Sequence, residues 1–201
     1  MKPTLTLADF QTAAKTLDVP VAAIRAFAEV ESRGSGFLPD DRPVILFERH
    51  VFRRQLVAHG ANLATIANLD RRRPDLCNQT PGGYGASVKE WKRLADAVLI
   101  HRAAALESAS YGAFQVMGFN WKRCGYASVQ ALVNAMYRGS ADHLDSFVRY
   151  IRSDAKLHKA LQAQDWATCA RLYNGPNFDA APGRDNDYDT RLVAAFARHS
   201  A

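Results

Sequence analysis

Apolar residues recur at helical spacing along most of this chain, and this periodicity limits the fold more than any other feature. Leu7, Phe10 and Leu17 lie on one such stripe near the start of the chain. Only the short run Val44–Phe47, which follows the turn-like segment Pro39–Pro43, has the composition of a strand. The pattern predicts a mainly α (α+β) domain with a small β element after the second helix.

Capping residues predict where several helices begin. Thr6–Asp9 matches a capping box, and Pro20 suits the first turn of a second helix that runs to about Ser32. Ser87–Glu90 is another capping-box match, and the helix that it opens is expected to reach Glu107.

The second half of the chain has an almost continuous helical pattern from Ser110 to Tyr173, interrupted near its glycines. Tyr188, Leu192 and Phe196 predict a last amphipathic helix. We expect this helix to dock on the core by its apolar face, the alternative being that it acts on a membrane.

Length and charge restrict the class of protein. The chain has 201 residues, and its hydrophobic content of 48% is enough for a core without disulfides or metal. No repeat or linker is present, so we expect one domain over residues 1–201. No apolar run approaches the ~18 residues of a membrane span. The net charge of +6 predicts an anionic partner, which could be nucleic acid, a membrane surface or an acidic polymer.

The first residues and the cysteines indicate a reducing compartment. Residues 1–6 lack the apolar stretch of a secretory signal, so we expect synthesis in a cytoplasm. Cys77, Cys124 and Cys169 are odd in number and form no C-x-x-C motif. We expect buried thiols, and the alternative is a catalytic cysteine–histidine pair.

Glu31 is an acidic residue on a face that should be buried. It follows Ile24 by seven residues, which places the two within ~20° of each other on a helix, whereas Glu29 points to solvent. Burial raises the pKa of a carboxyl, which keeps it protonated and able to act as a general acid. The alternative is a helix that frays before Glu31 and leaves it in water.

Ser110–Gly118 places a hydroxyl and an amide five residues apart. Ser110 and Gln115 are expected to line a groove, while Gly112 permits the close approach of a ligand or a neighbouring backbone. An amide both donates and accepts hydrogen bonds, which suits hydroxyl and N-acetyl groups of a sugar. The alternative is a buried helix crossing that needs a glycine.

Tyr173 closes an apolar stripe that includes Trp166 and Cys169, and Asn174-Gly175 ends the helix. A tyrosine on the inward face of a helix end is able to present its hydroxyl to a cleft. The alternative is a simple helix end with a packing aromatic.

The order of these motifs resembles that of the lysozyme and lytic-transglycosylase superfamily. Four longer strings are similar to the N-acetylmuramidase family of phage endolysins, namely Val30–Phe37, Ile45–His50, Ser110–Gly118 and Tyr173–Pro176. The resemblance covers the chain from about Leu7 to Arg198. It implies a lysozyme-like fold, no separate cell-wall-binding domain, and cleavage of the β-1,4 bond between N-acetylmuramic acid and N-acetylglucosamine in peptidoglycan, without a metal or cofactor.

The resemblance also implies roles for individual residues. Glu31 matches the catalytic general acid. Glu48 is the expected second carboxylate, with Asp40 and Asp41 as rivals and with an ion pair to Arg49 or His50 as its alternative role. The residues expected to bind sugar are Ser110, Tyr111, Gln115, Tyr173 and Asn174.

The implied partner is the glycan strand of peptidoglycan, on which a monomer is expected to act. Without a signal segment, the enzyme would be made in the host cytoplasm and reach the wall through a membrane lesion. The dispersed basic residues suit a weak attraction to an anionic outer membrane.

Three other functions compete with this interpretation. A lytic transglycosylase would use Glu31 alone and release 1,6-anhydromuramic products. A basic nucleic-acid-binding protein would use strings such as Arg71–Arg73. A zinc or cysteine–histidine amidase would need ligand spacings that the dispersed histidines do not have.

Overall fold

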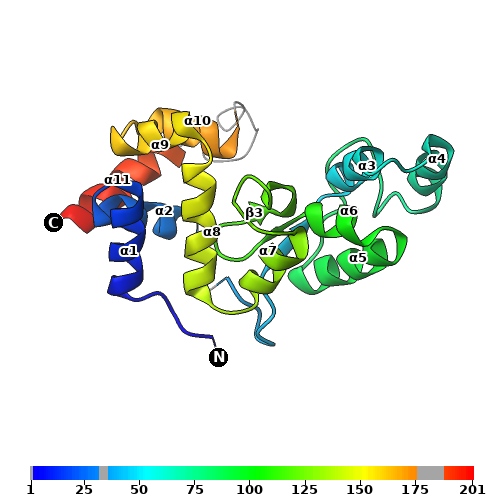
Figure 1. Ribbon diagram of the computed structural model, residues 1–201, viewed down its shortest axis with the longest axis horizontal. Coiled ribbons are helices and arrows are strands. Elements are labelled where there is room, and N and C mark those ends of the chain that lie inside the picture. Colours follow the sequence, from blue (N-terminus) through cyan, green and yellow to red (C-terminus); the bar gives the residue numbers. More distant parts are fainter. Residues whose placement is uncertain (1, 32–35, 176–187) are drawn as a thin grey trace.

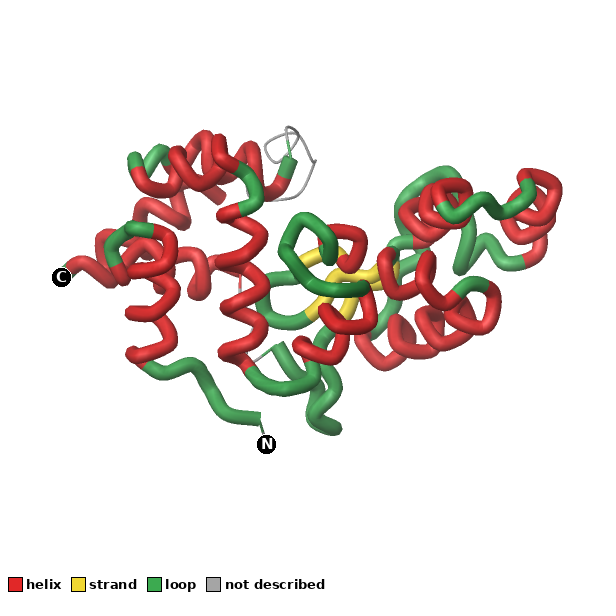
Figure 2. Tube along the Cα trace, in the orientation of Figure 1, coloured by secondary structure: helices red, strands yellow, loops and turns green. Residues whose placement is uncertain are grey.

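The computed structural model describes residues 2–31, 36–175 and 188–201, and in these residues eleven α-helices surround one small sheet (Figures 1 and 2). The helices are α1 (Leu7–Leu17), α2 (Val21–Glu31), α3 (Arg49–Ala58), α4 (Leu63–Arg72), α5 (Ser87–Ile100), α6 (Arg102–Glu107), α7 (Val129–Met136), α8 (Ser140–Arg152), α9 (Ala155–Gln162), α10 (Trp166–Asn174) and α11 (Tyr188–Ser200). The strands are β1 (Ile45–Phe47), β2 (Ala109–Tyr111) and β3 (Val116–Met117), and η1 (Gly118–Asn120) is a 3₁₀ turn. The predicted fold class is confirmed.

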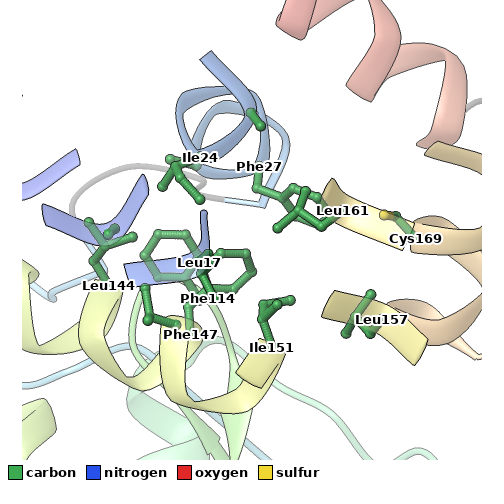
Figure 3. Packing of buried hydrophobic residues seen from close by; sticks show 14 of the residues in the cluster. Leu17, Ile24, Phe27, Phe114, Leu144, Phe147, Ile151, Leu157, Leu161 and Cys169 are labelled. Carbon is green, nitrogen blue, oxygen red and sulfur yellow. The ribbon is translucent and has the colours of Figure 1, made fainter. Parts of the chain in front are cut away.

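Two hydrophobic cores organise the molecule. The first joins α1 and α2 to α8–α11, which we call the terminal lobe, and the second joins α3–α7 to the sheet, which we call the central lobe (Figure 1). Phe114 belongs to the first core although it follows β2, and its ring stacks on Phe147 with centroids 4.8 Å apart (Figure 3). The segment after β2 therefore connects the two lobes.

The helices of the terminal lobe follow the sequence signals. Thr6 and Asp9 form the predicted capping box, because each side chain accepts the backbone N–H of the other residue. In α11, Leu192 is completely buried and Phe196 packs on Trp166 with ring centroids 5.1 Å apart. Helix α11 lies against α2, so the expected docking of the last helix is confirmed.

The prediction that helix begins at Ser110 is wrong, because Ala109–Met117 is a hairpin. Strand β2 pairs antiparallel with β1 in the register Leu46↔Ser110, and with β3 in the register Ser110↔Met117. The turn requires positive φ at Gly112 (+73°) and Gln115 (+48°), a backbone conformation that a helix excludes. The alternative of a glycine at a helix crossing is therefore also wrong.

The second predicted capping box is also wrong, because Glu90 is not a cap. The N-cap of α5 is Ala86, and the Glu90 side chain is buried with 1% exposure. Its carboxylate accepts the N–H groups of Phe47 (2.9 Å) and Gly85 (2.8 Å) and pairs with Arg93 (2.8 Å). This buried pair fixes the end of β1 against α5.

The single helix expected from Ser87 to Glu107 is divided at His101. Its φ of −157° is extended, and its ring nitrogen accepts the N–H of Ala104 at 3.2 Å, so α6 begins with its own cap.

Replacing Glu90 by alanine is expected to lower the free energy of unfolding by ~3–5 kcal/mol, because Arg93 is left buried without its partner. Urea denaturation followed by circular dichroism measures the change. The matched control is Lys92→Ala, whose exposed pair with Asp96 on the same helix is worth less than ~0.5 kcal/mol. Equal unfolding midpoints for the two variants would contradict this role of Glu90.

Candidate functional site

A cavity of about 450 Å³ brings together residues from both ends of the chain. Glu31 reaches it from the end of α2, Gln115 from the hairpin and Tyr173 from the end of α10. Asn120 and Arg123 line it from the segment after β3. Glu31, Gln115 and Tyr173, three of the residues predicted from sequence, are therefore neighbours in one site.

Glu31 is the last residue of α2 and is half-buried, so the alternative in which the helix frays before it is wrong. Ile24, two turns earlier on the same face of the helix, is completely buried, as the spacing predicted. The Tyr188 hydroxyl donates a hydrogen bond to Glu31 Oε1. Helix α11 thus supplies a group that orients the carboxyl at the cavity.

Tyr173 forms the aromatic wall of the cavity. Its hydroxyl donates to the backbone oxygen of Phe114 at 2.9 Å, and its ring packs edge-on against Phe27 and Tyr150, with centroids 5.7 Å away in both cases. Burial raises the pKa of Tyr173 well above its ordinary value, and the charge of Glu31 raises it further. The phenol therefore stays protonated beside the carboxyl.

Ser110 and Gln115, which were both expected to line a groove, bond to each other. Ser110 Oγ donates to Gln115 Oε1 at 2.6 Å, and Gln115 Nε2 donates to the Gly112 oxygen at 2.7 Å. Gln115 lines the cavity, whereas Ser110 is 95% buried behind it. These hydrogen bonds stabilise the hairpin turn. A contact between Ser110 and sugar stays a prediction.

Tyr111 and Asn174 are the other two residues predicted to bind sugar. Tyr111 has 1% exposure, donates its hydroxyl to the Leu106 oxygen at 2.9 Å and is not among the residues described around the cavity. Burial raises the pKa of Tyr111. Asn174 ends α10, but its side chain lies outside the described part of the structure.

Glu48, the residue expected to supply the second carboxylate, lies outside the cavity lining given by the described residues. Glu48 is the N-cap of α3, and its Oε2 accepts the Tyr84 hydroxyl at 2.9 Å and lies 3.2 Å from His50 Nδ1. Asp40 is exposed and paired with Arg42, and this hydrogen bond lowers the pKa of the Asp40 carboxyl. Asp41 lies in the same turn, with φ of +63°.

The hairpin turn and Gly36 pack against one buried histidine. His143, completely buried on α8, accepts the N–H of Ala113 through Nδ1 (3.2 Å) and donates from Nε2 to the Met136 oxygen (2.8 Å). A Cβ atom added at Gly36 or Gly112 would lie 2.7–2.8 Å from its ring. Only glycine permits this approach, and the neighbour of Gly112 is a side chain rather than the ligand or backbone that was expected. Burial lowers the pKa of His143, so the ring is neutral.

Sequence reasoning missed Asn120, Arg123 and Tyr150, which also line the cavity. The Arg123 guanidinium lies 4.8 Å from the centre of the Tyr150 ring, and its Nε donates to Ser153 Oγ at 2.9 Å. No local pattern marks these residues, because they meet only when α8 packs beside the segment after β3.

The described residues contain no group of three or more His, Cys, Asp or Glu side chains arranged to hold a metal ion. Cys77, Cys124 and Cys169 are buried as expected, and burial raises their thiol pKa values to about 12, 11 and 12. Such thiols are poor nucleophiles, which argues against the cysteine–histidine alternative.

Comparisons with known proteins agree on one family. The model of the N-acetylmuramidase (Muramidase) family matches residues 20–200. Among solved structures, the crystal structure of the Burkholderia AP3 phage endolysin is similar, with 47% sequence identity and a TM-score of 0.88. The match covers 98% of this chain and 71% of that one. The comparison with curated proteins gives no match.

Ser110→Ala and Gln115→Ala are each expected to lower the free energy of unfolding by ~1–3 kcal/mol, because each leaves a polar partner of the hairpin unpaired. The double variant should lose clearly less than the sum, because both single changes break the same hydrogen bond. Urea denaturation of the four proteins gives the coupling energy. Additivity within ~0.5 kcal/mol would contradict the bond.

Proposed function

This chain belongs to the N-acetylmuramidase family, and we propose that Glu31 is the general acid with which it cleaves the glycan strands of peptidoglycan. The family and the endolysin-like, lysozyme-like fold show a glycoside hydrolase that acts on peptidoglycan. The observation that carries the role of Glu31 is its position at the end of a buried helix, half-buried in the cavity and hydrogen-bonded by Tyr188.

The geometry suits protonation of a leaving group. Cleavage of a glycosidic bond requires an acid beside the bridging oxygen, because the departing sugar alkoxide must receive a proton. The Tyr188 hydroxyl holds one oxygen of the Glu31 carboxyl in a fixed orientation, and Tyr173, protonated beside it, adds no negative charge. Glu31 is then able to give its proton to the oxygen between N-acetylmuramic acid and N-acetylglucosamine.

Glu48 is the proposed second carboxylate. The backbone of Glu48 is extended, with φ and ψ of −101° and 101°. Because side chains alternate along a strand, Glu48 lies on the same face of the sheet as Leu46 and its cross-strand partner Ser110. The third residue in this row is Met117, which lines the cavity. The distance between the Glu31 and Glu48 carboxyl groups decides the mechanism: about 5–5.5 Å fits a covalent intermediate, and about 6.5–9.5 Å fits inversion through a water.

Gln115 and Tyr173 are the proposed sugar contacts, because both line the cavity that Glu31 enters. Ser110 would act through Gln115, whose amide it holds. Contacts of sugar with Tyr111 and Asn174 rest on the family resemblance alone.

The similarity to a phage endolysin supports the proposal that the enzyme lyses bacteria from within, reaching the wall through a membrane lesion. Helices of membrane-spanning length and hydrophobicity do not occur in the described residues. The net charge of +6 supports a weak attraction to an anionic outer membrane. We also propose one domain over residues 1–201, since the family model spans residues 20–200, and we propose that it acts as a monomer.

Glu31→Gln is expected to reduce the release of reducing sugar from purified peptidoglycan by ~100-fold or more, with an unchanged melting temperature, because the variant has no proton to give. The matched control is Glu29→Gln, an exposed acid on the same helix, which should retain activity. Mass spectrometry of the products should find reducing-end N-acetylmuramic acid. Products with 1,6-anhydromuramic acid would establish the transglycosylase reaction instead, and near-normal activity of Glu31→Gln would exclude Glu31 as the acid.

Glu48→Gln is expected to lower kcat by ~100-fold or more while KM changes little, because the change removes a base rather than a binding contact. Asp40→Asn and Asp41→Asn serve as controls for the two rival carboxylates. If one of these controls is inactive while Glu48→Gln is active, the second carboxylate has been assigned to the wrong residue.

A further inference from the structure

A second depression on the protein surface, of about 620 Å³, has three basic residues in its lining, and we call it the basic depression. Lys156 and Lys159 line it from α9 and Arg171 lines it from α10, two helices that pack side by side (Figure 1). All three residues are exposed, and none forms a salt bridge with a carboxylate in the described part of the chain. Their positive charges are therefore available to a ligand.

The acidic residue in the same lining, Asp165, has a structural task of its own. It is the N-cap of α10, and its Oδ1 accepts the N–H of Thr168 at 3.0 Å. Hydrogen bonds from Thr168 lower the pKa of Asp165, so its carboxylate stays charged in this task. Three cations beside one carboxylate leave the basic depression positive, which attracts an anionic ligand.

The basic depression adjoins the cavity that Glu31 enters. Leu172 lines both of them and so forms a wall that they share. A second connection runs through the start of α9, where the Asp154 carboxylate lies 3.7 Å from Arg123 on the cavity wall and accepts the N–H of Lys156 at 3.0 Å. A branch of the substrate that leaves the cavity past Leu172 therefore enters the basic depression.

The substrate of the proposed reaction has such a branch. Each N-acetylmuramic acid of peptidoglycan is able to carry a peptide stem on its lactyl group, and the stem has free carboxylates. Four extended residues span ~13 Å, which is enough to cross from a sugar in the cavity to the neighbouring depression. Lysine and arginine bind carboxylates through charge-assisted hydrogen bonds, whereas a neutral sugar gains little from three cations. The charge of the depression therefore fits the stem better than the glycan.

We propose that the basic depression binds the carboxylates of the peptide stem, so that the enzyme prefers glycan that carries stems over bare glycan. This inference rests on the proposed function, because it requires the glycan to occupy the cavity that Glu31 enters. Lys156, Lys159 and Arg171 are specificity-determining residues in this account, and they take no part in proton transfer.

The test compares kcat/KM on purified peptidoglycan and on the same material after an amidase has removed the stems. The wild-type enzyme should prefer the stem-bearing glycan, and added salt should weaken this preference because it screens exposed charges. The double variant Lys156→Gln/Lys159→Gln should lose about fivefold on stem-bearing glycan and little on bare glycan. Stem-bearing peptidoglycan whose carboxylates have been converted to amides should behave as bare glycan does.

The matched control is Lys15→Gln/Lys89→Gln, which removes the same charge from two exposed lysines outside the described linings of the cavity and the depression. It should keep the wild-type preference. A double variant Lys156→Gln/Lys159→Gln that keeps this preference would overturn the inference. An equal fall on all substrates would overturn it too, because it indicates general attraction to an anionic surface. Glu31→Gln, measured in parallel, tests the proposed function separately, because the catalytic proposal fails only if that variant remains active.

Discussion

The ring of His143 is the contact on which the site depends. Backbone from two distant segments packs against it, at Gly36 just after the Glu31 helix and at Gly112 in the hairpin turn, while its two nitrogens bond to Ala113 and Met136. A buried neutral imidazole with both nitrogens paired is a rigid element. It holds Gly36 and the turn of the hairpin that carries Gln115 against α8.

The last helix has a part in the site as well as in the core. Tyr188 lies 157 positions after Glu31 and donates to its carboxyl, and Arg191 donates to the Val30 oxygen at 3.2 Å. Helix α11 therefore fixes the end of α2 where the acid is placed. Leu192, Tyr188 and Phe196 of this helix belong to the core of the terminal lobe, which argues against the alternative in which the helix acts on a membrane. Figure 1 shows α11 beside α2.

Features that depend on local sequence could be predicted, and those that depend on distant packing could not. The capping box at Thr6–Asp9, the strand near Ile45 and the buried face of Glu31 follow from neighbours within one or two turns. The hairpin after Ser110 was missed because its turn needs positive φ at Gln115 and a glycine against His143, some thirty residues away. Asn120 was missed because it joins the cavity wall only in the folded chain, which no spacing reveals.

The most direct test of the central claim is a crystal structure of the Glu31→Gln variant with a peptidoglycan oligosaccharide bound. The account predicts that the scissile glycosidic oxygen lies ~3 Å from the side chain of residue 31, with the sugar in the cavity between α10 and the segment after β3. Saccharide bound only elsewhere, for example in the basic depression lined by Lys156, Lys159 and Arg171, would contradict it.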